Sequence, residues 1–322
     1  MRAAWVAALL SSLAAAPLTA RDIILTPPID CDLGADCFIQ QYVDHDPSSD
    51  ASDFRCSSLS YDGHKGTDFA LRTHEHMRRG VNVLPAAPGT VRATRDGMRD
   101  AIYTSDARAD VENRECGNGV VIDHGDGWST QYCHLKRGSV TVRKGDRVQQ
   151  NSVLGQVGLS GRTAFPHVHL TVRKDGKVVD PFDPDGAITC GTPGTDTLWQ
   201  SELPYRPGGV LSVGFADAVP RFDDIKAGTA AMAAMPVDAP ALVVFGYAFG
   251  GQAGDSMQLR IDGPDGVIMN EPVTINKDQA QFFRAVGKKR RANWPRGTYL
   301  GTVTLIRGPQ VINSVQGRVV ID

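Results

Sequence analysis

The sequence predicts a mainly β protein with two β units behind an export leader. Between Gly63 and Asp183, short runs of β-branched and aromatic residues alternate with glycine-containing turns, and helical periodicity is almost absent. A stretch rich in Pro, Gly and Thr at residues 192–209 separates these runs from a second set. The 322 residues exceed the roughly 100 to 150 of a typical domain, which also favours two units.

The first twenty residues are typical of a secretory leader. Arg2 supplies a positive start, residues 3–16 form an apolar run, and residues 17–20 offer a small-residue cleavage site. A buried or membrane-anchoring helix is the alternative, but the run is short for a bilayer span and no later segment could cross one. We therefore expect a periplasmic or secreted protein without a membrane span.

The cysteines predict disulfide bonds. They are Cys31, Cys37, Cys56, Cys116, Cys133 and Cys190. An even number of cysteines in an exported chain favours pairing. Proximity favours Cys31 with Cys37, and hairpin pairing favours Cys116 with Cys133, which would leave Cys56 with Cys190. A zinc site built from thiolates is the alternative, but the chain lacks a Cys-x-x-Cys pair.

The charge balance limits the classes of partner. The net charge of -2 gives no global field that would attract nucleic acid or an anionic membrane, so a partner must be recognised locally. Residues 288–291, with Trp294 behind them, could bind an anionic polymer. A solvated hairpin tip followed by a packed Trp is the simpler interpretation.

The pattern along the chain divides it into five segments. They are a signal peptide at 1–20, a loop-dominated, disulfide-tied lead-in at 21–60, a first β domain at 61–190, a linker at 191–209 and a β-sandwich (Ig-like) domain at 210–322. First-domain strands are expected at 120–122, 128–134, 140–142, 153–157, 168–172 and 178–179, with hairpin turns at 124–127 and 175–176. Sandwich strands are expected at 210–215, 242–249, 257–261, 281–286, 299–306 and 315–321, with a turn at 263–266.

Histidine and aspartate gather in short motifs of the first domain. The motifs are Gly63–Asp68, Gln131–Leu135, which contains His134, and His167–His169. The glycines around His64 favour a loop that enters a strand and brings His64 and Asp68 round a turn. His167 and His169 alternate along a strand, so they project from one face roughly 7 Å apart. Scattered, satisfied polar side chains are the alternative, but the combined pattern favours one metal site.

Imidazoles and a carboxylate suit zinc, and three protein ligands leave one coordination position for water. Bound zinc lowers the pKa of that water from 15.7 to roughly 7 and polarises a carbonyl, so the metal-bound water becomes a nucleophile for peptide bonds. Further histidines beside the metal can move protons or steady an oxyanion.

These motifs resemble those of the LytM/lysostaphin-type zinc metallopeptidases, which cleave peptide bridges in peptidoglycan. The resemblance covers roughly residues 56–185 and includes His-x-x-x-Asp, a His-Leu pair and a later His-x-His, in that order. It implies a barrel-sandwich-hybrid-like metallopeptidase domain that holds one Zn2+ ion. The implied zinc ligands are His64, Asp68 and His169, and the implied catalytic pair is His134 and His167.

Polar residues outside the three motifs could also have a role. The segment Leu71–Arg79, which departs from the family pattern, carries His74 and His76; these could bind a second metal, but an exposed charged loop is the simpler expectation. Asn118 could hydrogen-bond substrate or serve as a turn residue, and both interpretations stay open. His45 and His124 are expected to be structural.

The sequence thus predicts an exported zinc metalloendopeptidase that hydrolyses stem or cross-link peptides of bacterial peptidoglycan. One alternative is a non-catalytic wall-binding regulator of other cell-wall hydrolases, which the complete ligand set disfavours. A carrier module is the other, but Arg162 and Thr163 stand where a carrier needs a modifiable lysine. The sequence does not identify what the C-terminal domain binds.

Overall fold

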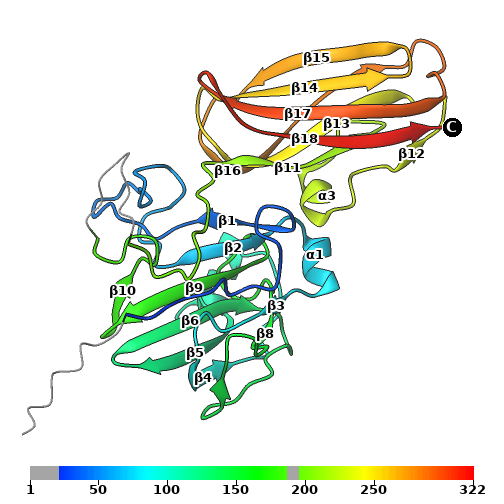
Figure 1. The fold of residues 1–322 in the computed structure, drawn as a ribbon. Coiled ribbons are helices and arrows are strands. Elements are labelled where there is room, and N and C mark those ends of the chain that lie inside the picture. Colours follow the sequence, from blue (N-terminus) through cyan, green and yellow to red (C-terminus); the bar gives the residue numbers. More distant parts are fainter. Residues whose placement is uncertain (1–21, 187–195) are drawn as a thin grey trace, which may run out of the picture.

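The computed structural model describes residues 22–186 and 196–322, which form two β bodies, one above the other (Figure 1). The predicted leader and Cys190 lie outside the described residues. Within the described part, every helix is too short or too polar to cross a bilayer. Strands dominate both bodies, so the prediction of a mainly β protein is confirmed.

The lower body is built on one antiparallel sheet in the order β1-β2-β9-β6-β5-β4-β7. β10 pairs with the C-terminal end of β9. Its strands are β1 (Cys37–Gln41), β2 (Thr67–Leu71), β4 (Gly89–Arg95), β5 (Asn118–Gly125), β6 (Trp128–Leu135), β7 (Arg147–Val148), β9 (His167–Lys174) and β10 (Lys177–Val179). A separate ribbon pairs β3 (Asn82–Val83) with β8 (Gly155–Gln156). The hydrophobic core of this body includes the buried side chains of Phe69, Tyr132 and Leu170.

The upper body is a sandwich of two sheets. One has the order β11-β13-β16, and the other β12-β18-β17-β14-β15. The bounds are β11 (Gly209–Ala216), β12 (Ala234–Met235), β13 (Ala241–Gly251), β14 (Ser256–Gly263), β15 (Gly266–Thr274), β16 (Gln279–Lys289), β17 (Gly297–Arg307) and β18 (Gln310–Ile321). Apolar side chains from both sheets, such as Phe215 and Leu259, fill the space between them.

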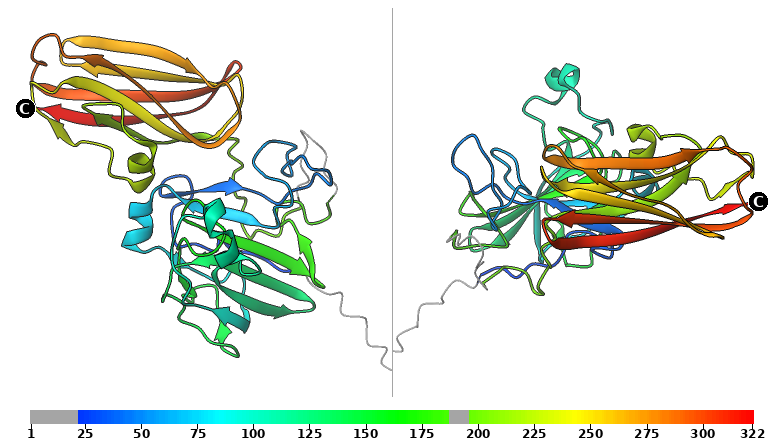
Figure 2. Two further views of the ribbon diagram at one scale, coloured as in Figure 1. Left: turned by 180° about the vertical axis from the view of Figure 1, so that it is seen from behind. Right: turned by 90° about the horizontal axis from the view of Figure 1, so that it is seen from above.

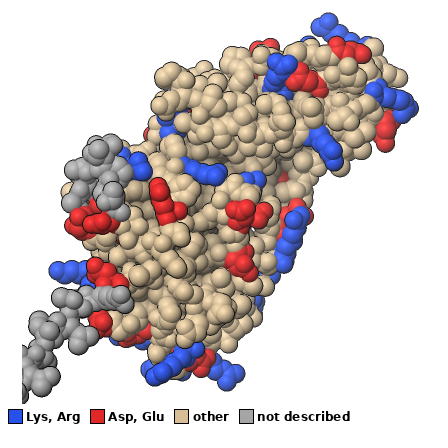
Figure 3. All heavy atoms as spheres, in the orientation of Figure 1, with Lys and Arg blue, Asp and Glu red and all other residues tan. Residues whose placement is uncertain are grey.

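The two bodies are in contact through β1, which lies on the side of the lower sheet that faces the sandwich (Figure 1). The rings of Phe38 and Phe249 are 4.6 Å apart, and the amide of Gln40 donates to the carbonyl of Ala280 at 2.9 Å. Figure 2 shows from two further sides that the sandwich extends well beyond this contact. Basic and acidic side chains are interspersed over the face in Figure 3, in keeping with the small net charge.

One predicted strand is absent, and several strands of the structure were not predicted. Residues 140–142 form no strand, because the single bond from the Thr141 amide to the Leu154 carbonyl is not part of a pairing between strands. Within the loop-dominated lead-in, β1 was not predicted, and it buries its apolar residues as the edge strand beside β2. β15 was missed because its residues are mostly exposed and lack a clear apolar alternation.

The segment predicted as an exposed charged loop is a short helix, α1 (His74–Arg79). The Thr73 hydroxyl caps its first turn by accepting from the His76 amide, and Gly80, with φ 85°, ends it. This helix contacts α3 (Phe222–Ala227) below the sandwich. The other helical segments are η1 (Ser105–Ala107) and α2 (Arg108–Val111).

Two of the predicted disulfides are confirmed, Cys31–Cys37 and Cys116–Cys133. The second joins the segment before β5 to the end of β6, next to His134. The remaining predicted pair includes Cys190, which is outside the described residues.

Removal of the Cys116–Cys133 bond by a double Ser substitution should lower the free energy of unfolding by about 3 kcal/mol, because a bond across 17 residues restricts the unfolded chain. The matched Cys31→Ser, Cys37→Ser variant lacks a bond that spans only 6 residues, so its free energy of unfolding should fall by about 2 kcal/mol. Denaturant titration measures both. An unchanged midpoint for the first variant would contradict the expectation.

Candidate metal centre

The pairing of three strands brings the histidine motifs together. β2 pairs with β9 so that Asp68 lies opposite His169, and β9 pairs with β6 so that His169 also lies opposite Cys133, the neighbour of His134. His167 is two residues before His169 on the same face of β9. His64 lies in the loop that enters β2, as its flanking glycines predicted. All five side chains therefore meet at one end of the sheet.

Three ligand atoms form a tight triangle. Oδ1 of Asp68 is 2.8 Å from Nδ1 of His169 and 3.2 Å from Nε2 of His64, and the two nitrogens are 3.1 Å apart. Two ligands of a tetrahedral zinc ion with bonds of about 2.0 to 2.1 Å lie about 3.3 Å apart. The edges of the triangle thus fit one such ion, and two imidazoles with one carboxylate are a donor set that zinc accepts.

Hydrogen bonds fix the orientation of the rings. Nδ1 of His64 donates to the carbonyl of Tyr42 at 2.6 Å, so Nε2 carries the lone pair that faces Asp68. Nε2 of His169 is 3.0 Å from the Thr171 hydroxyl, which leaves Nδ1 toward the triangle. Such bonds from the far side of a ring select the tautomer that can bind a metal.

The electrostatics of the cluster favour an ionised aspartate. Burial disfavours the charge on Asp68, but the neighbouring His167 and His64 outweigh it and hold the pKa of Asp68 well below its usual value. Burial lowers the pKa of His169. Burial also disfavours the charge on His64, but the neighbouring Asp68 outweighs it and raises the pKa of His64. An anionic carboxylate and a neutral imidazole are the protonation states that metal ligands need.

His134 and His167 lie beside the triangle. Their rings are 4.7 Å apart, and together with His169 they form a second group whose ligand atoms lie within 4.8 Å of one another. Nδ1 of His134 donates to the Ser160 carbonyl at 2.8 Å, and Nδ1 of His167 donates to the Phe165 carbonyl at 2.9 Å. Each ring therefore turns its Nε2 inward, and Nε2 of His167 is 3.4 Å from Oδ1 of Asp68.

The backbone at His134 is strained. Its φ is 65°, in the left-handed region that non-glycine residues rarely adopt, at a point where the register of β5 and β6 shifts. Bonds from the His134 amide to the Cys116 carbonyl and from the Gly158 amide to the His134 carbonyl hold this conformation. Burial, and then the neighbouring His167 and His169, keep the pKa of His134 well below its usual value, so its ring is neutral near pH 7.

Two supporting residues were not found from the sequence. Thr171 continues the His-x-His alternation on the same face of β9, which is a signal that could have identified it. Gly66 stands against the ring of His169, and a Cβ there would lie 2.6 Å from its Nε2 and 2.5 Å from the Leu170 carbonyl oxygen. The glycine therefore leaves the space that the His169 ring occupies.

The remaining polar candidates have structural contacts. Asn118 is buried. Its side chain accepts from the backbone amide of Met98 and donates to the carbonyls of Met98 and Leu135, so neither of its two expected roles fits. His45 bonds to Asp180 at 2.8 Å. His124 bonds to the Pro88 carbonyl and to the Thr130 hydroxyl, consistent with the structural role expected for it.

Residues 62–181 match the family model described as Peptidase family M23. The chain is 32% identical over 117 residues to the peptidoglycan DD-endopeptidase ShyA of Vibrio cholerae, covering 36% of this chain and 22% of ShyA. It is 38% identical over 118 residues to the DD-carboxypeptidase/endopeptidase Mpg of Neisseria meningitidis, covering 35% and 25%. It is also 41% identical over 66 residues to stage II sporulation protein Q of Bacillus subtilis, covering 20% and 23%.

The chain therefore spans a quarter or less of the length of these curated relatives. Among solved structures, it matches the SpoIIIAH and SpoIIQ complex with 24% identity and a TM-score of 0.35, covering 49% of this chain and 96% of that one. It matches the catalytic domain of lysostaphin from Staphylococcus simulans with 21% identity and a TM-score of 0.27, covering 37% and 76%.

We expect Gly66→Ala to weaken zinc binding at least tenfold, because the added methyl group must displace either the His169 ring or the backbone of β9. Gly155→Ala is the matched control, since its Cβ would meet no heavy atom closer than 3.1 Å. Competition titration with a zinc chelator measures both affinities. Wild-type zinc affinity in Gly66→Ala would show that the His169 ring is not held as described.

Proposed function

We propose that the chain is an exported zinc metalloendopeptidase that hydrolyses peptide cross-links of bacterial peptidoglycan. The observation that carries the proposal is the triangle of His64, Asp68 and His169 with two further histidines beside it. The M23 domain supports a peptidase, and relatives named peptidoglycan DD-endopeptidases support the substrate class.

In this proposal His64, Asp68 and His169 hold one zinc ion. Zinc bound there would polarise the scissile carbonyl and lower the pKa of a coordinated water. His134 accepts a proton at Nε2, because its Nδ1 is engaged by Ser160 and its ring is neutral near pH 7. His167 presents its Nε2 on the same side, where it can steady the developing negative charge or pass a proton to the leaving amine.

The proposal extends to the organisation of the whole chain. Residues 1–20 serve as the export signal, residues 61–190 form the peptidase domain, and residues 210–322 form a second domain that positions the enzyme or binds a partner. The periplasm or the extracellular space, where disulfides persist, is the proposed location, and both confirmed disulfides suit it.

Substitution of the ligands and of the catalytic pair should have different effects. His64→Ala and His169→Ala should lose stoichiometric zinc, because each removes one of three ligands. His134→Ala should keep zinc while its turnover falls about 100-fold or more, as expected for loss of a general base. Elemental analysis and peptidase assays measure these effects, and His124→Ala, at the far end of β5, is the matched control.

Zinc retained at one equivalent by His64→Ala would show that the ligand assignment is wrong. Full activity in His134→Ala would remove that residue from the mechanism.

Purified peptidoglycan of several cell-wall chemotypes should release new muropeptides when digested with the protein. A zinc chelator should abolish the release and added zinc should restore it, because the reaction depends on the bound ion. Mass analysis of the soluble products measures the outcome. If no wall type yields fragments, the non-catalytic regulator becomes the better explanation.

A further inference from the structure

The proposed zinc ligand His64 is held by residues that lie outside the stretch matched to the M23 family. That stretch is residues 62–181, whereas the contacts of His64 reach back to residues 42–44. Nδ1 of His64 donates to the Tyr42 carbonyl at 2.6 Å, and the Asp44 amide donates to the His64 carbonyl at 2.9 Å. The position of this ligand therefore depends on the lead-in as well as on the matched stretch.

His64 needs such support because it is not part of a strand. It lies three residues before β2, whose pairing with β9 begins at Thr67, so the sheet fixes Asp68 but does not fix His64. The preceding residue, Gly63, is exposed and has a φ of 71°, and glycine moves readily between this conformation and others. A contact from outside the loop therefore has to select the conformation that turns the imidazole toward the metal centre.

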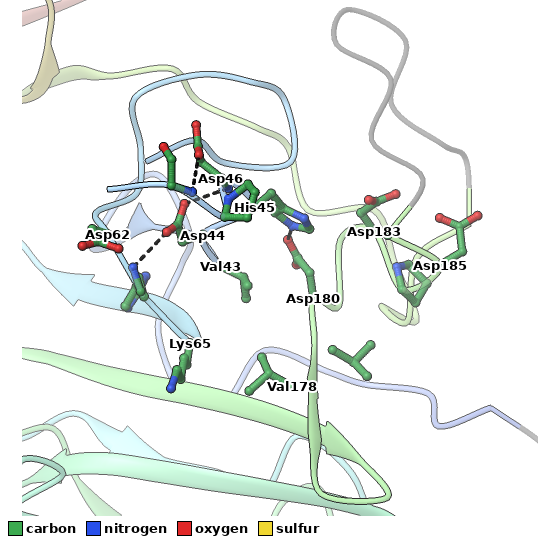
Figure 4. Close-up of a pocket in the computed structure, with 17 residues that line it drawn as sticks. Val43, Asp44, His45, Asp46, Asp62, Lys65, Val178, Asp180, Asp183 and Asp185 are labelled. Carbon is green, nitrogen blue, oxygen red and sulfur yellow. Dashed lines mark hydrogen bonds and ion pairs between the residues drawn. The ribbon is translucent and has the colours of Figure 1, made fainter. Parts of the chain in front are cut away.

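The carboxylate of Asp44 joins the loop of His64 to the lead-in. Its Oδ2 accepts from the Gly63 amide at 2.9 Å, and its Oδ1 accepts from the amides of Asp46 and Ser52, each at 3.1 Å. Figure 4 shows this carboxylate between the two segments that it joins. Hydrogen bonds from amides to an ionised carboxylate are stronger than bonds between neutral groups. Asp44 thus holds the backbone on both sides of the peptide bond between Gly63 and His64.

The lead-in can support the loop because Tyr42 is anchored in the core. Its side chain is buried, and its ring packs against the rings of Phe54, Phe182 and Tyr205, with centroids 5.0 to 5.4 Å apart. Such aromatic contacts fix the side chain and, with it, the local backbone. The carbonyl that accepts from the imidazole is therefore held in place, and the carboxylate that holds the loop follows two residues later.

Asp44 has no capacity left for a ligand of its own. It lies in the wall of a cavity of about 580 Å³ that is lined by residues 43–48, 62–65 and 178–186 (Figure 4). Its two oxygens already accept from three backbone amides, and among the described residues it belongs to neither group of possible metal ligands. Its contacts act on the loop of His64 instead.

We propose that Asp44 is a positioning residue for the metal centre. It holds the backbone of Gly63 and His64 so that Nδ1 of His64 meets the Tyr42 carbonyl while Nε2 faces the metal. The inference rests on the proposed function for the identity of the metal. It extends the metal centre into residues 42–44, which lie outside the stretch matched to the family.

The test compares the zinc affinity of Asp44→Asn with that of the wild-type full chain by competition with a chelator. Asn keeps the shape of the side chain but places an NH2 group where one oxygen now accepts. Loss of a contact that orients a metal-binding histidine costs roughly 10- to 100-fold in affinity, so the zinc affinity should fall at least about tenfold. Long-range 1H–15N spectra of the zinc-loaded proteins give a second readout. The Nδ1–H tautomer of His64 should be fixed in wild type, and its signal should broaden in the variant.

Asp46→Asn is the matched control, because it removes an equal charge from the same loop and its carboxylate accepts from the Ser48 amide within that loop. It should keep the zinc affinity and the His64 signal of the wild type. Hydrogen exchange of the wild type tests the contact without any variant. Since Gly63 is exposed, its amide should be protected only through its bond to Asp44.

Wild-type zinc affinity in folded Asp44→Asn would overturn the inference, and so would an unprotected Gly63 amide in the wild type. An equal loss of affinity in Asp46→Asn would overturn it too, since the effect would then be one of charge alone. Zinc binding that depends on Asp44, in a protein that releases no muropeptides, would keep the positioning role and contradict only the proposed enzymatic function.

Discussion

The antiparallel pairing of β2, β9 and β6 is the constraint on which the rest of this molecule depends. It places Asp68 opposite His169 and His169 opposite Cys133, so that side chains separated by about a hundred residues share one face and one end of the sheet. Because side chains alternate along a strand, a shift of one residue in either pairing would turn half of the cluster toward the opposite face. The apolar residues between the polar positions hold the register by burial in the core.

Each of the four imidazole rings in the buried polar cluster has a hydrogen-bond partner outside the cluster. The outward ring nitrogens form hydrogen bonds with the backbone carbonyls of Tyr42, Ser160 and Phe165 and with the Thr171 hydroxyl. Each bond leaves the other nitrogen of the ring pointing inward. The strained φ of His134 is held by two backbone hydrogen bonds and lies next to a disulfide, so local rigidity offsets the cost of that conformation.

Much of the fold followed from the sequence because its signals are local. Glycine-containing turns marked the hairpins at Asp126–Gly127 and Asp175–Gly176, and the alternation of His167 and His169 marked β9. The features that were missed depend on contacts between distant segments. β1 is a strand because β2 and the sandwich cover it, and α1 forms because Thr73 caps it and α3 packs nearby.

The same distinction applies to the site. The five cluster residues could be named from motif order, but the left-handed backbone of His134 and the close approach of Gly66 to His169 exist only in three dimensions. Asn118 shows the converse, because a residue for which the sequence left a substrate contact and a turn role open has its side chain committed to Met98 and Leu135. The cavity lined by residues 43–48, 62–65 and 178–186 is assembled from three separate segments, so no single stretch of sequence indicates it.

His169 belongs to two overlapping groups of possible ligands, one with His64 and Asp68 and one with His134 and His167. The choice between them decides which residues hold the metal and which move protons. An anomalous difference map at the zinc absorption edge, from crystals of the zinc-loaded protein, tests it most directly. Our interpretation predicts one peak within the triangle of His64, Asp68 and His169, and a peak bounded instead by His134, His167 and His169 would contradict it.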